Sequence, residues 1–175
     1  MKIRTASVAD AEAIAAIYAP IVNETAISFE WMPPTAEEFR ERIIKTLTEY
    51  AWLVATDDAD QITGYVFANS HKEPVSYHWS VNTSVYIRAD SRGRGIGRAL
   101  YTELFRQLVL LGYHRAFAGV ALPNPASIAL HESLGFKLVG IYKNVGFKFG
   151  AWRDVSWWQR DLQPPEALPE KTPLR

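Results

Sequence analysis

The sequence predicts one mixed α/β domain, in which a single sheet carries helices on both of its faces. Three observations lead to this prediction. The chain has 175 residues, which suits one compact domain. Apolar spacing and capping signals predict four helices, and shorter alternating or continuous apolar segments predict seven strands. These elements follow the order strand, helix, helix, three strands, helix, strand, helix and two strands, which is typical of a mixed α/β sheet.

The N-terminal half begins with a short alternating stretch at residues 2–5, which we expect to be an edge strand. Ser7-x-x-Asp10 and Thr35-x-x-Glu38 are capping boxes, and a helical stripe of apolar residues follows each of them. The aromatic loop AISFEWMPP joins the two helices. The segments WLVA and ITGYVFAN are the next two strands, and a third strand runs through residues 77–87.

The C-terminal half is predicted to contain two helices and three strands. One helix starts after Gly95, and the strand AFAGVA follows it. Asn124-Pro125 begins the last helix as its N-cap and first-turn proline. Two strands near residues 138–149 and 155–162 complete the sheet.

The domain is expected to span residues 1–162. The remaining segment, 163–175, holds four prolines, so we predict a Pro-rich extended tail. Trp157 and Trp158 should point to opposite faces of the last strand, which leaves one of them available to a partner subunit.

Composition excludes several classes of function. Lys and Arg total 19, as do Asp and Glu, so bulk charge argues against a nucleic-acid or membrane partner. The chain has no cysteine, which excludes disulfides, thiolate metal sites and a cysteine nucleophile. No apolar run approaches the roughly 18 residues of a membrane span, and the N-terminus does not read as a signal peptide. A cytoplasmic location is the resulting expectation.

The segment RGRGIGR, residues 92–98, joins a predicted strand to a predicted helix. Unpaired amides at a glycine-rich helix start attract anions, and arginines add charge and forked donors. We therefore expect a pyrophosphate there. The spacing differs from the dinucleotide fingerprint G-x-G-x-x-G, because Arg98 stands at the place of the third glycine, and no Walker motif is present. A tight turn with solvated arginines is the alternative interpretation.

The pattern R-x-x-G-x-G resembles the phosphate loop of the GNAT acetyltransferases. Asn124 and the segment ASIALHESLGF that follows are similar to that family's second cofactor segment. The stretches YHWSVNTSVYI and VGFKFGAWRDVSWWQRDL resemble the phosphinothricin N-acetyltransferase branch, and the similarity covers about residues 2–162. This resemblance implies a GNAT-like, largely antiparallel sheet of about seven strands and a homodimer.

The resemblance also implies the activity, which is acetyl-CoA-dependent acetylation of the primary amine of a small molecule. An amino acid or an analogue of the phosphinothricin or methionine sulfoximine type would be the acceptor. The amine attacks the thioester directly in this family, so neither an enzyme nucleophile nor a metal is needed. By resemblance, acetyl-CoA would be held by backbone groups of Val85, Tyr86 and Ile87, by the loop Arg92, Gly93, Arg94, Gly95, Ile96, Gly97 and Arg98, and by Asn124 and Ser133.

The candidate catalytic residues are His131 and Asn82, whose positions are functional in the branch by resemblance, and Glu30, a carboxylate of this chain. The matching histidine of the branch lies at the active site. The branch usually carries a glutamate as general base where this chain has Asn82, and an amide cannot take up a proton near neutral pH. Either another group takes up the proton, for which His131 and Glu30 are the candidates, or a water chain carries it, or the substrate arrives neutral. His131 could serve as base or acid.

The acceptor is expected to bind near Phe29, Glu30, Trp31 and Lys72. Phosphinothricin-type enzymes often have an arginine at the position of Glu30, so an anionic acceptor should bind less well here.

The other three histidines do not form a ligand set, and HESLG is not the zinc motif H-E-x-x-H, so no metal is expected.

Two other functions stay open on the sequence. Loss of the usual glutamate permits a catalytically weak GNAT-like domain that binds acetyl-CoA as a sensor or regulator. The segment RGRGIGR also permits an RNA-binding module. The neutral overall charge and the absence of other basic clusters in the sequence argue against this module.

Overall fold

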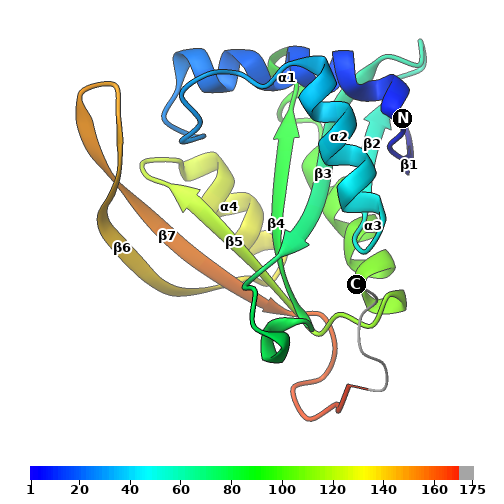
Figure 1. Cartoon of the computed structure of the whole chain (residues 1–175), viewed down its shortest axis with the longest axis vertical. Helices are drawn as coiled ribbons and strands as arrows, with labels where there is room; N and C mark the ends of the chain where they lie inside the picture. Colours follow the sequence, from blue (N-terminus) through cyan, green and yellow to red (C-terminus); the bar gives the residue numbers. More distant parts are fainter. Residues whose placement is uncertain (170–175) are drawn as a thin grey trace.

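A computed structural model describes residues 1–169, within which seven strands form one sheet in the order β1-β2-β3-β4-β5-β7-β6 (Figure 1). The strands are β1 (Lys2–Thr5), β2 (Trp52–Thr56), β3 (Ile62–Ser70), β4 (Ser80–Ile87), β5 (Arg115–Ala121), β6 (Lys137–Lys148) and β7 (Ala151–Asp161). The α-helices are α1 (Ala11–Glu24), α2 (Ala36–Leu47), α3 (Ile96–Leu110) and α4 (Pro125–Ser133). Neighbouring strands are antiparallel except β4 and β5, so the predicted order and the largely antiparallel sheet are confirmed.

The sheet has an apolar core on each face. Helices α1 and α2 enclose one core with β2 and β3, in which Ile14, Phe39 and Trp52 are buried. Helix α3 and the end of α4 enclose the other core, which contains Leu104 and Leu108. The predicted placement of helices on both faces is therefore confirmed.

Two of the predicted helix starts have the expected cap geometry. Thr35 Oγ1 accepts from the Glu38 amide at 3.2 Å, and the Glu38 carboxylate accepts from the Thr35 amide at 2.6 Å. Asn124 Oδ1 accepts from the Ser127 amide at 3.2 Å. Each bond satisfies an amide that the helix itself leaves unpaired, which is why these sequence signals were reliable.

Two strand boundaries differ from the prediction. Strand β4 begins at Ser80 rather than at residue 77, because Val75–Tyr77 forms a 3-10 turn in which the Tyr77 amide donates to the Pro74 carbonyl at 2.9 Å. The fixed φ of proline favours such a turn. Strand β7 begins at Ala151 rather than near residue 155, because it continues β6 as one long hairpin.

Strands β4 and β5 are paired only where they begin. Ser80–Asn82 pairs with Arg115–Phe117, and the strands then diverge, as Figure 1 shows. From Thr83 onward, the edge of β4 that faces β5 has no strand partner among the described residues. Since unpaired backbone groups attract an extended partner, this gap can bind a ligand that pairs with β4 as another strand would.

The C-terminal segment follows directly from the sheet. Strand β7 ends at Asp161, and the Gln163 side chain donates to the Tyr113 carbonyl at 3.0 Å. The division of the chain into residues 1–162 and an extended tail stays a prediction. Residues 170–175 of that tail lie outside the described residues.

Candidate active site

The gap between the diverging strands continues as a narrow opening, which we call the β4–β5 slot. It is lined by residues 83–86 of β4 and 118–121 of β5, with Tyr101, Asn124, Ser127 and His131 from the α3 and α4 side and Ile27 from the α1–α2 loop. Thr83 Oγ1 donates to the Phe117 carbonyl at 3.1 Å and closes the slot at the point where the strands part. Four residues predicted from the sequence, Val85, Tyr86, Asn124 and His131, are thereby brought together.

The start of helix α3 presents backbone amides to solvent. Gly93 and Gly95 have φ angles of 74° and 76°, a conformation that favours glycine, and a Cβ at either position would enter open space. The first amide of the helix that pairs with a preceding carbonyl belongs to Ala99, which donates to Gly95 at 3.1 Å. The amides of Ile96 and Gly97 therefore stand at the helix start, where the helix dipole favours an anion.

Of the other residues in the segment 92–98, the first two arginines face solvent and the last two residues contact helix α4. Arg92 and Arg94 are exposed. A Cβ on Gly97 would lie 3.1 Å from Leu130 Cδ2, so this glycine also lets α4 pack closely against α3. Arg98 donates to the Ser133 carbonyl at 3.3 Å, while the Ser133 hydroxyl caps the Leu130 carbonyl at 2.7 Å. Arg98 and Ser133 thus join the two helices, and their contacts with acetyl-CoA stay predictions.

His131 lies in the wall of the β4–β5 slot with both ring nitrogens bonded. Nδ1 lies 2.7 Å from the Ser127 carbonyl, and Nε2 lies 2.9 Å from the Tyr101 hydroxyl. A carbonyl only accepts, so Nδ1 carries the proton and Nε2 accepts from Tyr101. Burial lowers the pKa of His131, and the bond to Ser127 only partly offsets this effect. The ring is therefore neutral, and its basic nitrogen is already occupied.

Tyr101 is fully buried at the slot and connects His131 to β4. Its hydroxyl lies 3.3 Å from Thr83 Oγ1 as well as 2.9 Å from the histidine. Burial raises the pKa of Tyr101, so the hydroxyl keeps its proton at neutral pH. Nothing in the sequence singles out Tyr101, because it reads as one more apolar position of helix α3.

Asn82 lies on the face of the sheet opposite to His131, where it contacts His71, a histidine to which the sequence assigns no role. Asn82 Oδ1 is 2.9 Å from His71 Nδ1, and Asn82 Nδ2 donates to the Ser70 carbonyl at 3.2 Å. The His71 ring stacks on Phe117 of β5, with ring centroids 4.1 Å apart. His71 and Asn82 are eleven positions apart in the chain. They meet across the β3–β4 connection because the register of these strands pairs Asn69 with Asn82.

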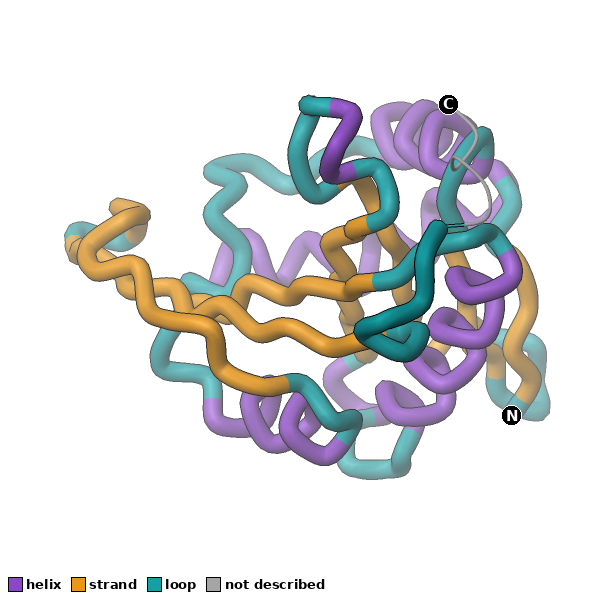
Figure 2. The backbone as a smooth tube through the Cα atoms, turned by 90° about the horizontal axis from the view of Figure 1, so that it is seen from below, coloured by secondary structure: helices purple, strands orange, loops and turns teal. Residues whose placement is uncertain are grey.

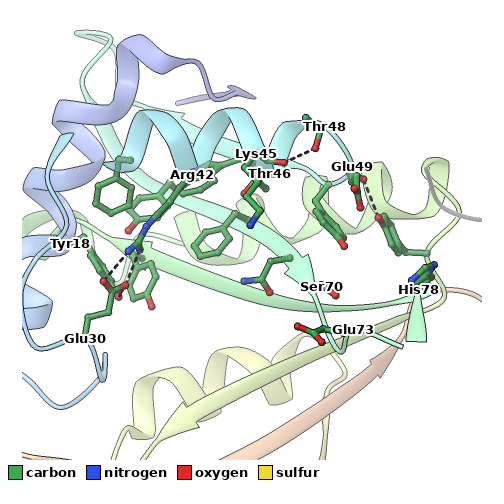
Figure 3. Close-up of a pocket in the computed structure, with 18 residues that line it drawn as sticks. Tyr18, Glu30, Arg42, Lys45, Thr46, Thr48, Glu49, Ser70, Glu73 and His78 are labelled. Atoms are coloured by element: carbon green, nitrogen blue, oxygen red, sulfur yellow. Dashed lines mark hydrogen bonds and ion pairs between the residues drawn. The ribbon is translucent and has the colours of Figure 1, made fainter. Parts of the chain in front are cut away.

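A larger opening beside the slot, which we call the α2 groove, has a volume of about 1080 Å³. It lies on the face covered by α1 and α2, and Tyr86 lines both openings. Five charged residues line it, namely Glu30, Arg42, Lys45, Glu49 and Glu73 (Figure 3). Eight of its 18 lining residues are aromatic and include Tyr18, Phe39, Trp52, Tyr65 and Phe67. Such a surface accommodates an apolar side chain.

Glu30 is held at one end of the α2 groove by two partners. Its carboxylate accepts from both Arg42 terminal nitrogens, at 2.8 and 3.1 Å, and from the Tyr18 hydroxyl at 3.2 Å (Figure 3). The bond to Glu30 raises the pKa of Arg42 further above its ordinary range. Glu30 and Arg42 thus neutralise each other, and the guanidinium fork is occupied.

The remaining predicted acceptor residues are not brought together with Glu30. Phe29 packs against the β6–β7 hairpin, where a Cβ on Gly146 would overlap its ring. Trp31 is 72% exposed, and Lys72 is also exposed. Neither lines the α2 groove or the β4–β5 slot, so their contacts with an acceptor stay predictions.

Lys148 of β6 anchors the loop that carries Phe29 and Glu30. Its ammonium is buried and donates to the carbonyls of Val22 and Ser28, both at 2.7 Å. Burial lowers the pKa of Lys148. The hairpin therefore positions one end of the α2 groove.

Replacing Lys148 with methionine is expected to lower the free energy of unfolding by about 1–3 kcal/mol, because two carbonyls lose a buried donor while the side-chain volume is nearly kept. Urea unfolding measures this loss. Lys143→Met on the same hairpin is the control: it breaks an exposed pair with Asp154 and should cost less than about 1 kcal/mol. Equal losses in the two variants would contradict the anchoring role of Lys148.

Two further properties concern metals and membranes. Among residues 1–169 no group of three or more His, Asp or Glu side chains is arranged to hold a metal ion. None of the helices in the described part of the chain is long and apolar enough to cross a membrane.

Comparison with known proteins identifies the family. Residues 3–157 match the model of the acetyltransferase (GNAT) domain. The chain is 40% identical over 156 residues to a phosphinothricin N-acetyltransferase of Streptomyces coelicolor, covering 87% of this chain and 91% of the relative. It is 36% identical over 168 residues to an L-methionine sulfoximine/L-methionine sulfone acetyltransferase of Pseudomonas aeruginosa, covering 95% and 98% of the two chains.

A solved structure agrees with these matches. The crystal structure of a GNAT superfamily phosphinothricin acetyltransferase from Sinorhizobium meliloti in complex with AcCoA has a TM-score of 0.90 and 34% identity, covering 99% of this chain and 98% of the other. Since the family match spans both strands of the slot and the start of α3, this chain belongs to the GNAT acetyltransferases and is an acetyl-CoA-dependent N-acetyltransferase.

Proposed function

We propose that this N-acetyltransferase acetylates the α-amine of a small amino acid whose side chain is uncharged, such as methionine sulfone, methionine sulfoximine or an apolar amino acid. The observation that carries this proposal is the aromatic α2 groove, which shares Tyr86 with the β4–β5 slot. The names of the relatives support an amino-acid analogue as acceptor. Because Glu30 occupies the fork of Arg42, a second anionic group, as in phosphinothricin, gains little there.

Acetyl-CoA fits the residues on the other side of the sheet. The edge of β4 at Val85 and Ile87 has no strand partner among the described residues and can pair with the amides of the pantetheine arm, although Arg92 Nε already donates to the Ile87 carbonyl at 3.3 Å. The amides at the start of α3 can bind the pyrophosphate. Asn124, although engaged as a helix cap, lines the slot between these two regions. In this arrangement the thioester supplies the acetyl group, and the protein positions it and handles the protons.

The wall of the slot supplies a proton to the departing sulfur in this proposal. Tyr101 is a buried hydroxyl that keeps its proton, and His131 accepts from it. His131 has no free basic nitrogen, which disfavours it as the base, and its bond to Tyr101 makes it a positioning residue for that hydroxyl. Glu30 is engaged by Arg42 and Tyr18, which disfavours it as the base.

A screen of thiol release tests the proposal. Purified protein and acetyl-CoA are offered methionine sulfone, methionine sulfoximine, phosphinothricin, apolar amino acids and polyamines. We expect the uncharged amino acids to have the highest kcat/KM and phosphinothricin a lower one. Higher kcat/KM for phosphinothricin or polyamines would contradict the acceptor class. Binding of acetyl-CoA without thiol release from any amine would favour the alternative, a catalytically weak sensor or regulatory domain.

A homodimer is the assembly that we propose. The β6–β7 hairpin projects from the sheet (Figure 2) and exposes a group of large apolar side chains, namely Leu138, Val139, Ile141, Tyr142, Val145, Phe147 and Trp152. Such a surface is typical of a protein–protein contact. Sedimentation should give twice the mass of the 175-residue chain.

A cytoplasmic location and the lack of nucleic-acid and membrane partners stay predictions.

A further inference from the structure

We propose that His71 is the general base that removes the proton from the attacking amine. This inference rests on the proposed function, since it assigns a catalytic residue to the same reaction. The reaction needs such a group, because most amines are protonated near neutral pH and only the lone pair attacks. Asn82 lies on the face of the sheet that carries the α2 groove, but its side chain is an amide and is not basic.

The hydrogen bonds of Asn82 determine which nitrogen of His71 carries the proton. Asn82 Nδ2 donates to the Ser70 carbonyl, so its Oδ1 is the atom that faces the histidine at 2.9 Å. An amide oxygen only accepts, and therefore His71 Nδ1 donates. The neutral ring then carries its lone pair on Nε2, which is the form that a base requires. Asn82 acts here as a positioning residue.

The ring lies beside the point at which β4 and β5 part and the slot begins, while His71 itself lines neither the slot nor the α2 groove. Its neighbours Asn82 and Phe117 form the last bonded pair between β4 and β5, and the slot opens at the next residue of each strand. Stacking on Phe117 at 4.1 Å, with the Tyr77 ring 5.8 Å away, restricts the orientation of the imidazole. The ring is half-buried, so a proton that it takes up can return to solvent.

The reaction converts an amine and a thioester into an amide and a thiol. The amine nitrogen bonds to the carbonyl carbon of the acetyl group, the carbon–sulfur bond breaks, and the proton on nitrogen passes to Nε2 of His71. The sulfur receives a proton either from Tyr101, which then regains one from solvent, or directly from water. His71 then loses its proton to solvent, and the free thiol and the N-acetyl product leave.

His71→Gln and His71→Ala test the assignment by kinetics. Glutamine can still donate to Asn82 but is not basic, so a histidine that merely held the loop would be replaced by it without loss. We expect kcat to fall about 10²-fold or more in both variants, while the Kd for acetyl-CoA stays within about twofold. Turnover of His71→Gln equal to that of the unaltered protein would overturn the inference.

Two rescue measurements separate catalysis from a structural defect. Added imidazole should restore part of the turnover of His71→Ala, because it supplies the missing base. Introducing Asn82→Glu into His71→Ala should restore more, because a carboxylate then stands one hydrogen bond from the lost ring. If neither recovers activity, His71 is structural.

The tautomer is measurable whether or not an acceptor is found. Nitrogen–proton correlation spectra of the imidazole should show the neutral His71 ring protonated on Nδ1. An Nε2-protonated ring would overturn the inference even in a protein without turnover. Failure of the thiol-release screen with a correct tautomer would instead count against the proposed function alone.

Discussion

Replacing Gly95 with valine is expected to raise the Kd for acetyl-CoA more than tenfold, which corresponds to about 1.4 kcal/mol or more. Gly95 is the N-cap of α3 and has a φ of 76°, which a β-branched residue adopts only with strain. Its Cβ would also enter the open space in front of the helix amides, where the pyrophosphate is expected. Calorimetric titration with acetyl-CoA measures the change.

Gly150→Val is the matched control. Gly150 has a φ of 71° and open space around its Cβ, like Gly95, but it lies at the turn between β6 and β7. The two variants therefore share the backbone strain and differ only in their distance from the proposed pyrophosphate site. We expect unchanged affinity in Gly150→Val. An equal change in both, or unchanged affinity in a folded Gly95→Val protein, would remove the anion site from this loop.

Replacing Tyr101 with phenylalanine is expected to lower kcat by about 10²-fold or more, the usual range for loss of a general acid. The ring that fills the core is kept, and only the hydroxyl that donates to His131 and lies 3.3 Å from Thr83 Oγ1 is removed. Acetyl-CoA should still bind, because the predicted contacts of its pyrophosphate and pantetheine are elsewhere. Steady-state kinetics and calorimetry together test this separation of turnover from affinity.

The companion variant His131→Ala should lower kcat by a similar factor. If Tyr101 and His131 act as one unit, the double variant should be little slower than either single variant. Losses that multiply would mean that the two residues act independently. Unchanged turnover of Tyr101→Phe would show that the sulfur takes its proton from water.

Structural features that depend on contacts within a few residues could be predicted from the sequence alone. Thr35-x-x-Glu38 and Asn124 cap helices wherever those helices pack, because their partners are three residues away. Gly95 was informative for the same reason, since a positive φ at a helix start is a local requirement. Alternating apolar residues identified the strands, and the motifs together identified the family, since the chain matches it over residues 3–157.

The contacts between side chains of different elements depend on the tertiary structure and could not be predicted from local sequence. His71 contacts Asn82 because the register of β3 on β4 and the 3-10 turn at Val75–Tyr77 return the chain to that point. Glu30 pairs with Arg42 because α2, which carries Arg42, lies beside the loop that carries Glu30. This pairing leaves neither charge free. His131 became a neutral partner of Tyr101 through burial between two helices and the sheet. Such protonation states and partners depend on desolvation and on distances between elements, which no local sequence pattern encodes.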